Sequence, residues 1–254
     1  MSPEQLLTCA LDIGENMLIS GAEIGRVEDS IRLICRTYGC QRTNVFTITS
    51  SIVVSIEDTN RNYYTQTRRI TGTQTDLSRL DKLNTLSRDI CRNRPDYDYI
   101  QSRLAQILSA QRYPLWLEVV CSAMIGSAFA VFFGGNLPDA AVAALLGGLL
   151  RLTVFGLGKL GTNQILMNLI SAFCLSLTAI LLVRLGFGND ANKIILGNIM
   201  LLIPGIALTN SLRDMISGDI ISGLLRFFDA ILVAAAIAVG YIFAAQLLGG
   251  YLWI

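Results

Sequence analysis

The stretch ILMNLISAFCLSLTAILLVRL, residues 165–185, decides the fold class, because it is apolar over 21 residues and carries a single charge near its end. A helix that spans a bilayer needs about 20 predominantly apolar residues. Four further apolar stretches surround it, at residues 115–133, 137–157, 194–208 and 224–248. The stretch at 194–208 is short and interrupted by Pro204 and Gly205. The sequence therefore predicts a membrane protein with a bundle of about five transmembrane helices.

Charge divides the chain into two parts. Residues 1–113 hold 14 Lys/Arg and 13 Asp/Glu, whereas residues 114–254 hold only 6 of each over a longer stretch. We therefore predict a soluble domain at 1–113 and a transmembrane domain at 114–254. The balanced charge of the soluble part excludes a basic nucleic-acid binder. The chain has no histidine, which excludes Ser-His and Cys-His triads and zinc hydrolase sites.

The soluble part has the pattern of a small α+β domain. Apolar residues recur at helical spacing around residues 7–18 and 24–38, and again at 77–90 and 100–107. Between these pairs of helices, β-branched and aromatic residues dominate at 43–56 and 62–70, with a polar turn at 58–60. Two or three antiparallel strands are expected there. The six cysteines show no metal-ligand spacing, so we expect no metal site and no cofactor.

Basic residues between the apolar stretches predict the orientation. If residues 1–113 are cytoplasmic, the connections that carry Arg151 with Lys159 and Arg213 with Arg226 are cytoplasmic too. With five spans, the N-terminus then lies in the cytoplasm and the C-terminus outside.

Polar residues near the apolar stretches are candidates for function, because intramembrane polar groups are costly. In the segment 204–214, PGIALTNSLRD, proline breaks the helix, and broken helices form the substrate site of many secondary transporters. On a continued helix Asn210, Arg213 and Asp214 share one face. The alternative is a simple kink with a solvated Arg213–Asp214 pair. Glu118 lies one turn inside the first span, where it could carry a coupled proton, pair with an arginine or reach the interface.

A second polar segment lies in the soluble part, SGAEIGRVED at residues 20–29. It concentrates charge on the exposed face of a predicted helix. Glu23 and Glu28 could in principle form an acid–base pair, but no nucleophile or metal site accompanies them. We therefore do not expect an enzyme.

Together these motifs resemble the threonine/serine exporter family. The run S-G-A-E-x-x-R-V-E-D at 20–29 and the run P-G-x-x-x-T-N-S-L-R-D-x-x-x-G-D-x-x-S-G at 204–223 carry the resemblance. It implies a cytoplasmic domain with about five helices in a bacterial cell membrane, and export of small hydrophilic metabolites by a secondary mechanism. It also implies the larger subunit of a two-component branch that has a small membrane subunit as partner and includes proteins associated with succinate export. Matched by motif, the positions expected to matter are Glu23, Arg26, Glu28, Pro204, Gly205, Thr209, Asn210, Arg213, Asp214 and Asp219.

The leading hypothesis is therefore an exporter, driven by the proton-motive force, of threonine/serine-type amino acids or succinate-type dicarboxylates. The expected substrate-binding residues are Pro204, Gly205, Thr209, Asn210 and Arg213. The expected coupling charges are Glu118, Asp214 and Asp219. An odd span count with polar residues at membrane depth favours a homo- or hetero-oligomer. The alternatives are a non-transporting membrane sensor or scaffold whose cytoplasmic domain binds a metabolite, and a membrane-tethered hydrolase.

Overall fold

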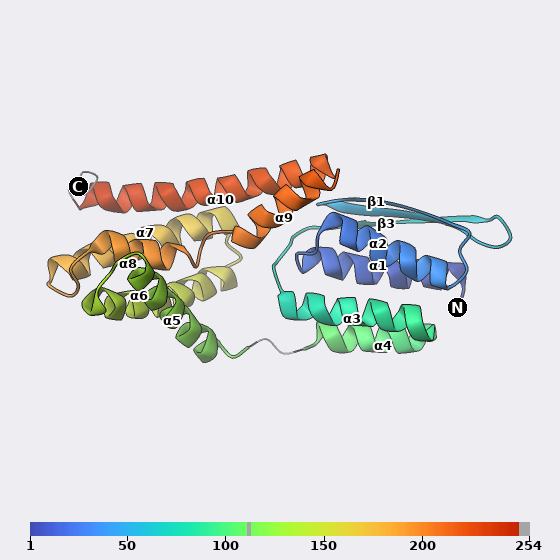
Figure 1. The fold of residues 1–254 in the computed structure, drawn as a ribbon, viewed down its shortest axis with the longest axis horizontal. Coiled ribbons are helices and arrows are strands. Elements are labelled where there is room, and N and C mark those ends of the chain that lie inside the picture. Colours follow the sequence, from blue (N-terminus) through green and yellow to red (C-terminus); the bar gives the residue numbers. More distant parts are fainter. Residues whose placement is uncertain (111–112, 249–254) are drawn as a thin grey trace. The chain divides into compact units, whose positions relative to one another are not determined.

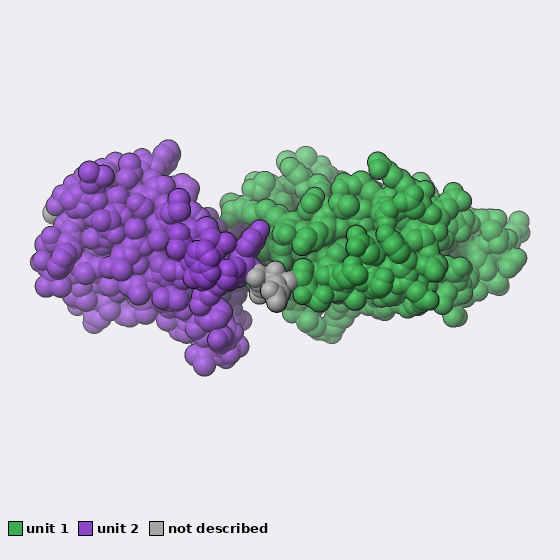
Figure 2. Space-filling model, turned by 90° about the horizontal axis from the view of Figure 1, so that it is seen from below, with its two compact units in different colours: residues 1–111, 205–228 green, residues 112–204, 229–254 purple. Residues whose placement is uncertain are grey.

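The computed structural model describes residues 1–110 and 113–248, and it is mostly helical. The chain forms two compact units, one of residues 1–111 with 205–228 and one of residues 112–204 with 229–254 (Figure 2). These units differ from the contiguous ranges 1–113 and 114–254 expected from charge, because residues 205–228 pack with the N-terminal residues. The C-terminal end, predicted to lie outside the membrane, falls outside the described residues.

The first unit begins as an α+β structure, as predicted (Figure 1). Two helices precede a three-stranded sheet, and two more helices follow it. The elements in chain order are α1 (Pro3–Ile19), α2 (Ile24–Thr37), β1 (Arg42–Ile48), β2 (Ser51–Glu57), β3 (Tyr63–Arg69), α3 (Leu77–Asn93) and α4 (Tyr97–Leu108).

Local sequence signals set where these helices begin. Ser2 and Gln5 form a capping box at the start of α1, and Pro3 stands in its first turn, where a missing N–H costs nothing. The carboxylates of Asp76 and Asp96 accept backbone N–H groups at the starts of α3 and α4. These caps satisfy donors that have no partner within the helix.

The core of this unit lies between the sheet and the helices. The sheet is antiparallel in the order β1-β2-β3, with Val45 opposite Val54 and Val54 opposite Gln66. Alternate residues of β2 are fully buried, and they join the apolar faces of α1 and α2 in one cluster. A Cβ at Gly14 would come within 2.5 Å of the Ile31 side chain, so glycine allows α1 and α2 to approach closely.

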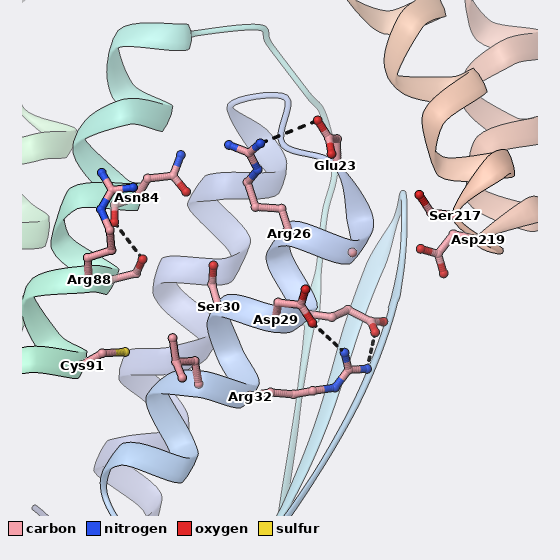
Figure 3. A pocket seen from close by; sticks show the side chains of 14 residues that line it. Glu23, Arg26, Asp29, Ser30, Arg32, Asn84, Arg88, Cys91, Ser217 and Asp219 are labelled. Carbon is pink, nitrogen blue, oxygen red and sulfur yellow. Dashed lines mark hydrogen bonds and ion pairs between the residues drawn. The ribbon is translucent and has the colours of Figure 1, made fainter.

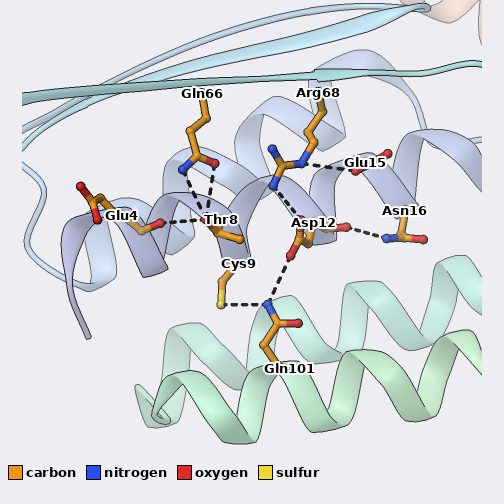
Figure 4. Close-up of polar contacts among 9 residues, drawn as sticks. All are labelled: Glu4, Thr8, Cys9, Asp12, Glu15, Asn16, Gln66, Arg68 and Gln101. Atoms are coloured by element: carbon orange, nitrogen blue, oxygen red, sulfur yellow. Dashed lines mark hydrogen bonds and ion pairs between the residues drawn. The ribbon is translucent and has the colours of Figure 1, made fainter.

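A polar layer ties α1 to its neighbours (Figure 4). Arg68 on β3 lies between two carboxylates of α1, with its Nη2 3.2 Å from Asp12 Oδ1 and its Nε 3.6 Å from Glu15 Oε2. Gln101 on α4 donates to the other oxygen of Asp12 at 3.2 Å. One carboxylate therefore connects the sheet, α1 and α4, which fixes their register.

The remaining helices are α5 (Leu115–Phe132), α6 (Leu137–Lys159), α7 (Gln164–Arg184), α8 (Ala191–Ile199), α9 (Gly205–Ile216) and α10 (Ile220–Leu247). Of the described helices, four are long and apolar enough to cross a membrane: α5, α6, α7 and α10. The stretch 194–208 is not one helix, because α8 ends at Ile199 and α9 begins after Pro204. The count of five spans therefore stays a prediction.

Helix α8 packs inside the second unit, against α5, α6 and α7. Its Asn198 is fully buried, and the side-chain amide donates to the Ile194 carbonyl at 3.0 Å. A Cβ at Gly126 or Gly147 would lie within 2.3 or 2.9 Å of Asn198 Oδ1. These glycines therefore permit close helix packing around Asn198.

Asp139 organises one end of the second unit. It is buried at the start of α6, where its Oδ2 accepts the Asn136 N–H at 3.1 Å. Its Oδ1 accepts the N–H groups of Asn189 at 2.6 Å and Asp190 at 3.0 Å. The carboxylate therefore fastens the α7–α8 connection to the α5–α6 connection.

Candidate functional site at helix α9

The two polar segments singled out in the sequence meet within the first unit. The turn at residues 20–23 joins α1 to α2, and the positive φ of Gly21 (93°) explains the glycine there. Helix α9 lies against this turn. Asn210, on α9, donates its side-chain amide to the Gly21 carbonyl at 3.0 Å.

Asp214 caps the α2 helix from 190 residues away. Glu23 is the N-cap residue of α2 but makes no side-chain cap hydrogen bond. Instead, Asp214 Oδ1 accepts the N–H of Ile24 at 3.1 Å. Free N–H groups and the helix dipole both favour a carboxylate at a helix N-terminus. The tertiary fold thus supplies a cap that the local sequence does not.

Arg226 completes this contact from the first turns of α10. Its Nη1 donates to Asp214 Oδ2 at 3.1 Å and its Nη2 donates to the Ala22 carbonyl at 2.9 Å. Asp214 is only 2% exposed and the Arg226 side chain 13%. Burial raises the pKa of Asp214 above its ordinary value, while Arg226 and the Ile24 N–H oppose that rise. This is a buried ion pair with hydrogen bonds at both ends.

A more exposed ion pair lies beside it. Arg213 pairs with Glu23 across the same contact. Arg26 approaches the same Glu23 oxygen from α2, at 3.9 Å. Glu23 is therefore shared by two guanidinium groups, one from α9 and one from its own helix. Asn210, Arg213 and Asp214 do share one helix face, as predicted, and that face contacts residues 21–24.

Glycines shape the turn from α9 to α10. Gly218 has a positive φ of 100°, and the N–H of Asp219 donates to the Asp214 carbonyl at 2.9 Å. A Cβ at Gly223 would lie 2.6 Å from the Ser211 carbonyl oxygen and 2.5 Å from the Met215 side chain. The G-D-x-x-S-G pattern therefore encodes a tight helical hairpin.

The other predicted site residues have separate roles. The Thr209 hydroxyl donates to the Gly205 carbonyl within α9, at 2.9 Å, just after the break at Pro204. Glu28 joins α2 to β1 by accepting the Thr47 N–H at 2.9 Å, and it pairs with Arg32 at 2.5 Å.

Glu118 lies in the second unit, where its partner is Arg151. The Nε of Arg151, on α6, donates to Glu118 Oε2, on α5, at 2.9 Å. Pairing with an arginine was one of three alternatives that the sequence left open for Glu118, and it did not identify which arginine. The sequence analysis used Arg226 only to predict the orientation of the helices, and it did not predict the ion pair of Arg226 with Asp214. A lone arginine near the start of an apolar stretch was the signal that could have found it.

A family model described as "Putative threonine/serine exporter" matches residues 8–248, a range that includes both segments. The chain is 24% identical to the "Probable threonine/serine exporter" of Mycobacterium tuberculosis and 25% identical to the "Threonine/serine exporter" of Corynebacterium glutamicum. Each alignment covers 95% of this chain, and 46% and 51% of those proteins.

A shorter relative is the "Probable succinate transporter subunit YjjP" of Escherichia coli, 27% identical over 63% of this chain and 62% of that protein. The chain thus spans about half the length of the exporters it matches, and no solved structure matches it. With the family model covering both segments and nearly the whole chain, the protein belongs to the threonine/serine exporter family.

Proposed function

We propose that this chain is the membrane subunit of an exporter that moves small carboxylate-bearing metabolites out of the cell and is not an enzyme. Family membership and the four long apolar helices support a membrane exporter. The relatives' names supply the candidate substrates, threonine and serine on one side and succinate on the other. We further propose a cytoplasmic N-terminus, with a small membrane subunit as partner, since one relative is named as a transporter subunit.

One observation carries the proposed mechanism. Helix α9 follows the break at Pro204, and its polar face is bound to the start of α2 through Asp214, Asn210 and Arg213. These few contacts are what would have to break for α9 to leave the start of α2. We propose that α9 alternates between this contact and a released state during transport, and that substrate carboxylate competes with Glu23 for Arg213.

The coupling charge is the second part of the proposal. Glu118 faces Arg151 between two apolar helices, where a carboxylate is costly unless it is paired or protonated. The Glu118–Arg151 pair is therefore the first candidate for the coupling site. Asp214 and Asp219, at the α9–α10 turn, are the other candidates.

Efflux from preloaded cells tests the exporter. Cells that express this chain, with and without a small membrane subunit of the same family, are loaded with labelled threonine, serine or succinate. We expect selective efflux that requires the subunit and is lost in Arg213→Ala while folded protein remains. Unchanged transport in that variant would remove Arg213 from the site. No efflux of any substrate, with both proteins in the membrane, would contradict the exporter.

A cavity in the first unit favours one alternative, a membrane sensor whose N-terminal part binds a metabolite without transport. Binding to the purified chain, together with no efflux from cells, would favour that function.

A further inference from the structure

The end of helix α2 brings two cysteines together. After the C-cap residue Tyr38, Gly39 takes a positive φ of 92°, and its N–H donates to the Arg36 carbonyl at 3.0 Å. The N–H of Cys40 donates to the Cys35 carbonyl at 3.2 Å. These two bonds form a Schellman motif, in which the side chains at the positions of Cys35 and Cys40 are frequently in contact. In this chain both positions hold cysteine, and both cysteines are free.

The backbone at this helix end meets the distance requirement for a disulfide. Two cysteines whose Cα atoms are more than about 7 Å apart cannot be bridged without backbone movement. The 3.2 Å bond from the Cys40 N–H to the Cys35 carbonyl, with the covalent bonds on either side of it, keeps the two Cα atoms within about 7 Å. The side chains are close as well, because the Cys35 thiol donates a hydrogen bond to the Cys40 sulfur. A disulfide here would link the last turn of α2 to the residues that lead into β1.

The two thiols differ in exposure and in acidity. Cys35 is fully buried, whereas Cys40 is half-buried and borders solvent. The hydrogen bond from Cys35 lowers the pKa of Cys40, while that bond and burial raise the pKa of Cys35. Because the thiolate is the reactive form, an oxidant reaches and oxidises Cys40 first. An accessible, acidic thiol beside a second thiol is the usual arrangement of a redox-sensitive pair.

Two other cysteines of the first unit have different partners. Cys91, on α3, lines a cavity of about 780 Å³ between α2, α3 and the α9–α10 turn, and its sulfur points toward α2 (Figure 3). Its hydrogen-bond partner is the Thr37 hydroxyl, and burial raises its pKa. Cys9 is fully buried on α1, where the Gln101 amide donates to its sulfur at 3.7 Å. These two sulfurs contact groups other than thiols, whereas Cys35 contacts Cys40.

We propose that Cys35 and Cys40 are a modification site, a thiol pair that a peroxide converts to a reversible disulfide. The Cys40 sulfur attacks one oxygen of hydrogen peroxide and the O–O bond breaks, which leaves a sulfenic acid on Cys40; the Cys40 proton leaves with the departing hydroxide as water. The Cys35 sulfur then attacks the Cys40 sulfur, and the Cys35 proton leaves with the sulfenic hydroxyl as a second water. Two thiols are thus oxidised while one peroxide is reduced to two waters. Exchange with a small thiol such as glutathione reverses the bond.

The test uses the purified full-length chain in detergent, treated with hydrogen peroxide, blocked with N-ethylmaleimide and digested with trypsin. Cleavage after Arg32, Arg36 and Arg42 puts the two cysteines in separate peptides, LICR (33–36) and TYGCQR (37–42). We expect these peptides to be joined by a disulfide, with a mass two hydrogen atoms below that of the reduced peptides together. Dithiothreitol should separate them, and mass spectrometry follows both steps.

Three variants assign the roles of the thiols. Cys35→Ser should stop the reaction at the sulfenic acid on Cys40, which the trapping reagent dimedone labels. Cys40→Ser should give neither the linked peptides nor a sulfenic acid on Cys35. Cys91→Ser removes another half-buried thiol of the same unit and is the matched control, so it should form the linked peptides at the wild-type rate.

Results on the wild-type chain can overturn the inference without any variant having to fold. Absence of the linked peptides after oxidation would refute the disulfide, and so would a disulfide that joins Cys40 to Cys91 instead. Oxidation of Cys91 as fast as that of Cys40 would refute the selectivity on which the site depends. Because no substrate or gradient is involved, these outcomes leave the proposed exporter untouched, and failure of efflux leaves the thiol pair untouched.

Discussion

Replacing Asp214 by asparagine should release α9 from the start of α2. The carboxylate is nearly fully buried and balances the charge of Arg226, which is itself mostly buried. Removing one partner of a buried ion pair costs about 3–5 kcal/mol, because the remaining charge stays buried without compensation. Loss of a helix cap costs about 1 kcal/mol, but asparagine can still accept the Ile24 N–H. We therefore expect Asp214→Asn to lower the free energy that holds α9 against α2 by about 3–5 kcal/mol.

Hydrogen exchange measures this effect locally. The N–H of Ile24 is bonded to Asp214, so its protection reports the opening of the α9 contact. A loss of about 3 kcal/mol corresponds to faster exchange by roughly a hundredfold. Asp81→Asn, at an exposed position on α3, is the matched control and should leave exchange unchanged.

The double variant Asp214→Asn with Arg226→Gln distinguishes charge from packing. It removes the uncompensated charge, so it should recover a large part of the protection that the single variant loses. The reasoning fails if Asp214→Asn exchanges at the wild-type rate over residues 20–26, or if the double variant is as destabilised as the sum of the two single variants.

Three further predictions concern other parts of the chain. Gly223→Ala forces a methyl group into the α9–α10 contact and should lower the free energy of unfolding by about 1–3 kcal/mol. Gly156→Ala is the control, because no atom lies within 4 Å of the added Cβ, and it should not lower the free energy of unfolding. Thermal unfolding in detergent compares the two variants. Asp139→Ala leaves three backbone N–H groups without their acceptor and should lower the free energy of unfolding by at least about 3 kcal/mol, measured in the same way. An effect as small as that of Gly156→Ala would refute the role of Asp139 in joining the α5–α6 and α7–α8 connections. The pKa of Cys40 is lowered by a hydrogen bond from a neighbouring thiol, and the pKa of Cys91 is raised by burial. Since the thiolate is the reactive form, alkylation of Cys40 should reach half its maximal rate at a lower pH than alkylation of Cys91, and mass spectrometry resolves the two sites.

The α9 contact gives a physical reason why two segments 190 residues apart both carry unusual polar patterns. The start of α2 lacks a cap of its own, and α9 provides one through Asp214. The Asp214–Arg226 pair is buried in this contact and bonds to the backbone of Ile24 and Ala22. Family members that share both segments are expected to share the contact.

Local patterns in the sequence were sufficient for most of the architecture. Apolar length identified the long helices, helical periodicity identified α1 to α4, and β-branched residues identified the sheet, since each of these properties depends on neighbours in the chain. The break at Pro204 was visible for the same reason, because a missing N–H acts on its own helix. The shared face of Asn210, Arg213 and Asp214 follows from helical spacing alone.

Only the tertiary structure decided what those groups contact. Ion pairs such as Asp214–Arg226 and Glu118–Arg151 join different helices, and charge counts do not select one partner among several. By composition, residues 205–228 belong to the predicted transmembrane domain, as the ends of two spans and the connection between them, yet they pack with the N-terminal unit. The physical reason is that hydrophobicity acts along the chain and fixes which segments become helices, whereas capping and charge pairing act through space and require the folded chain to bring their partners together.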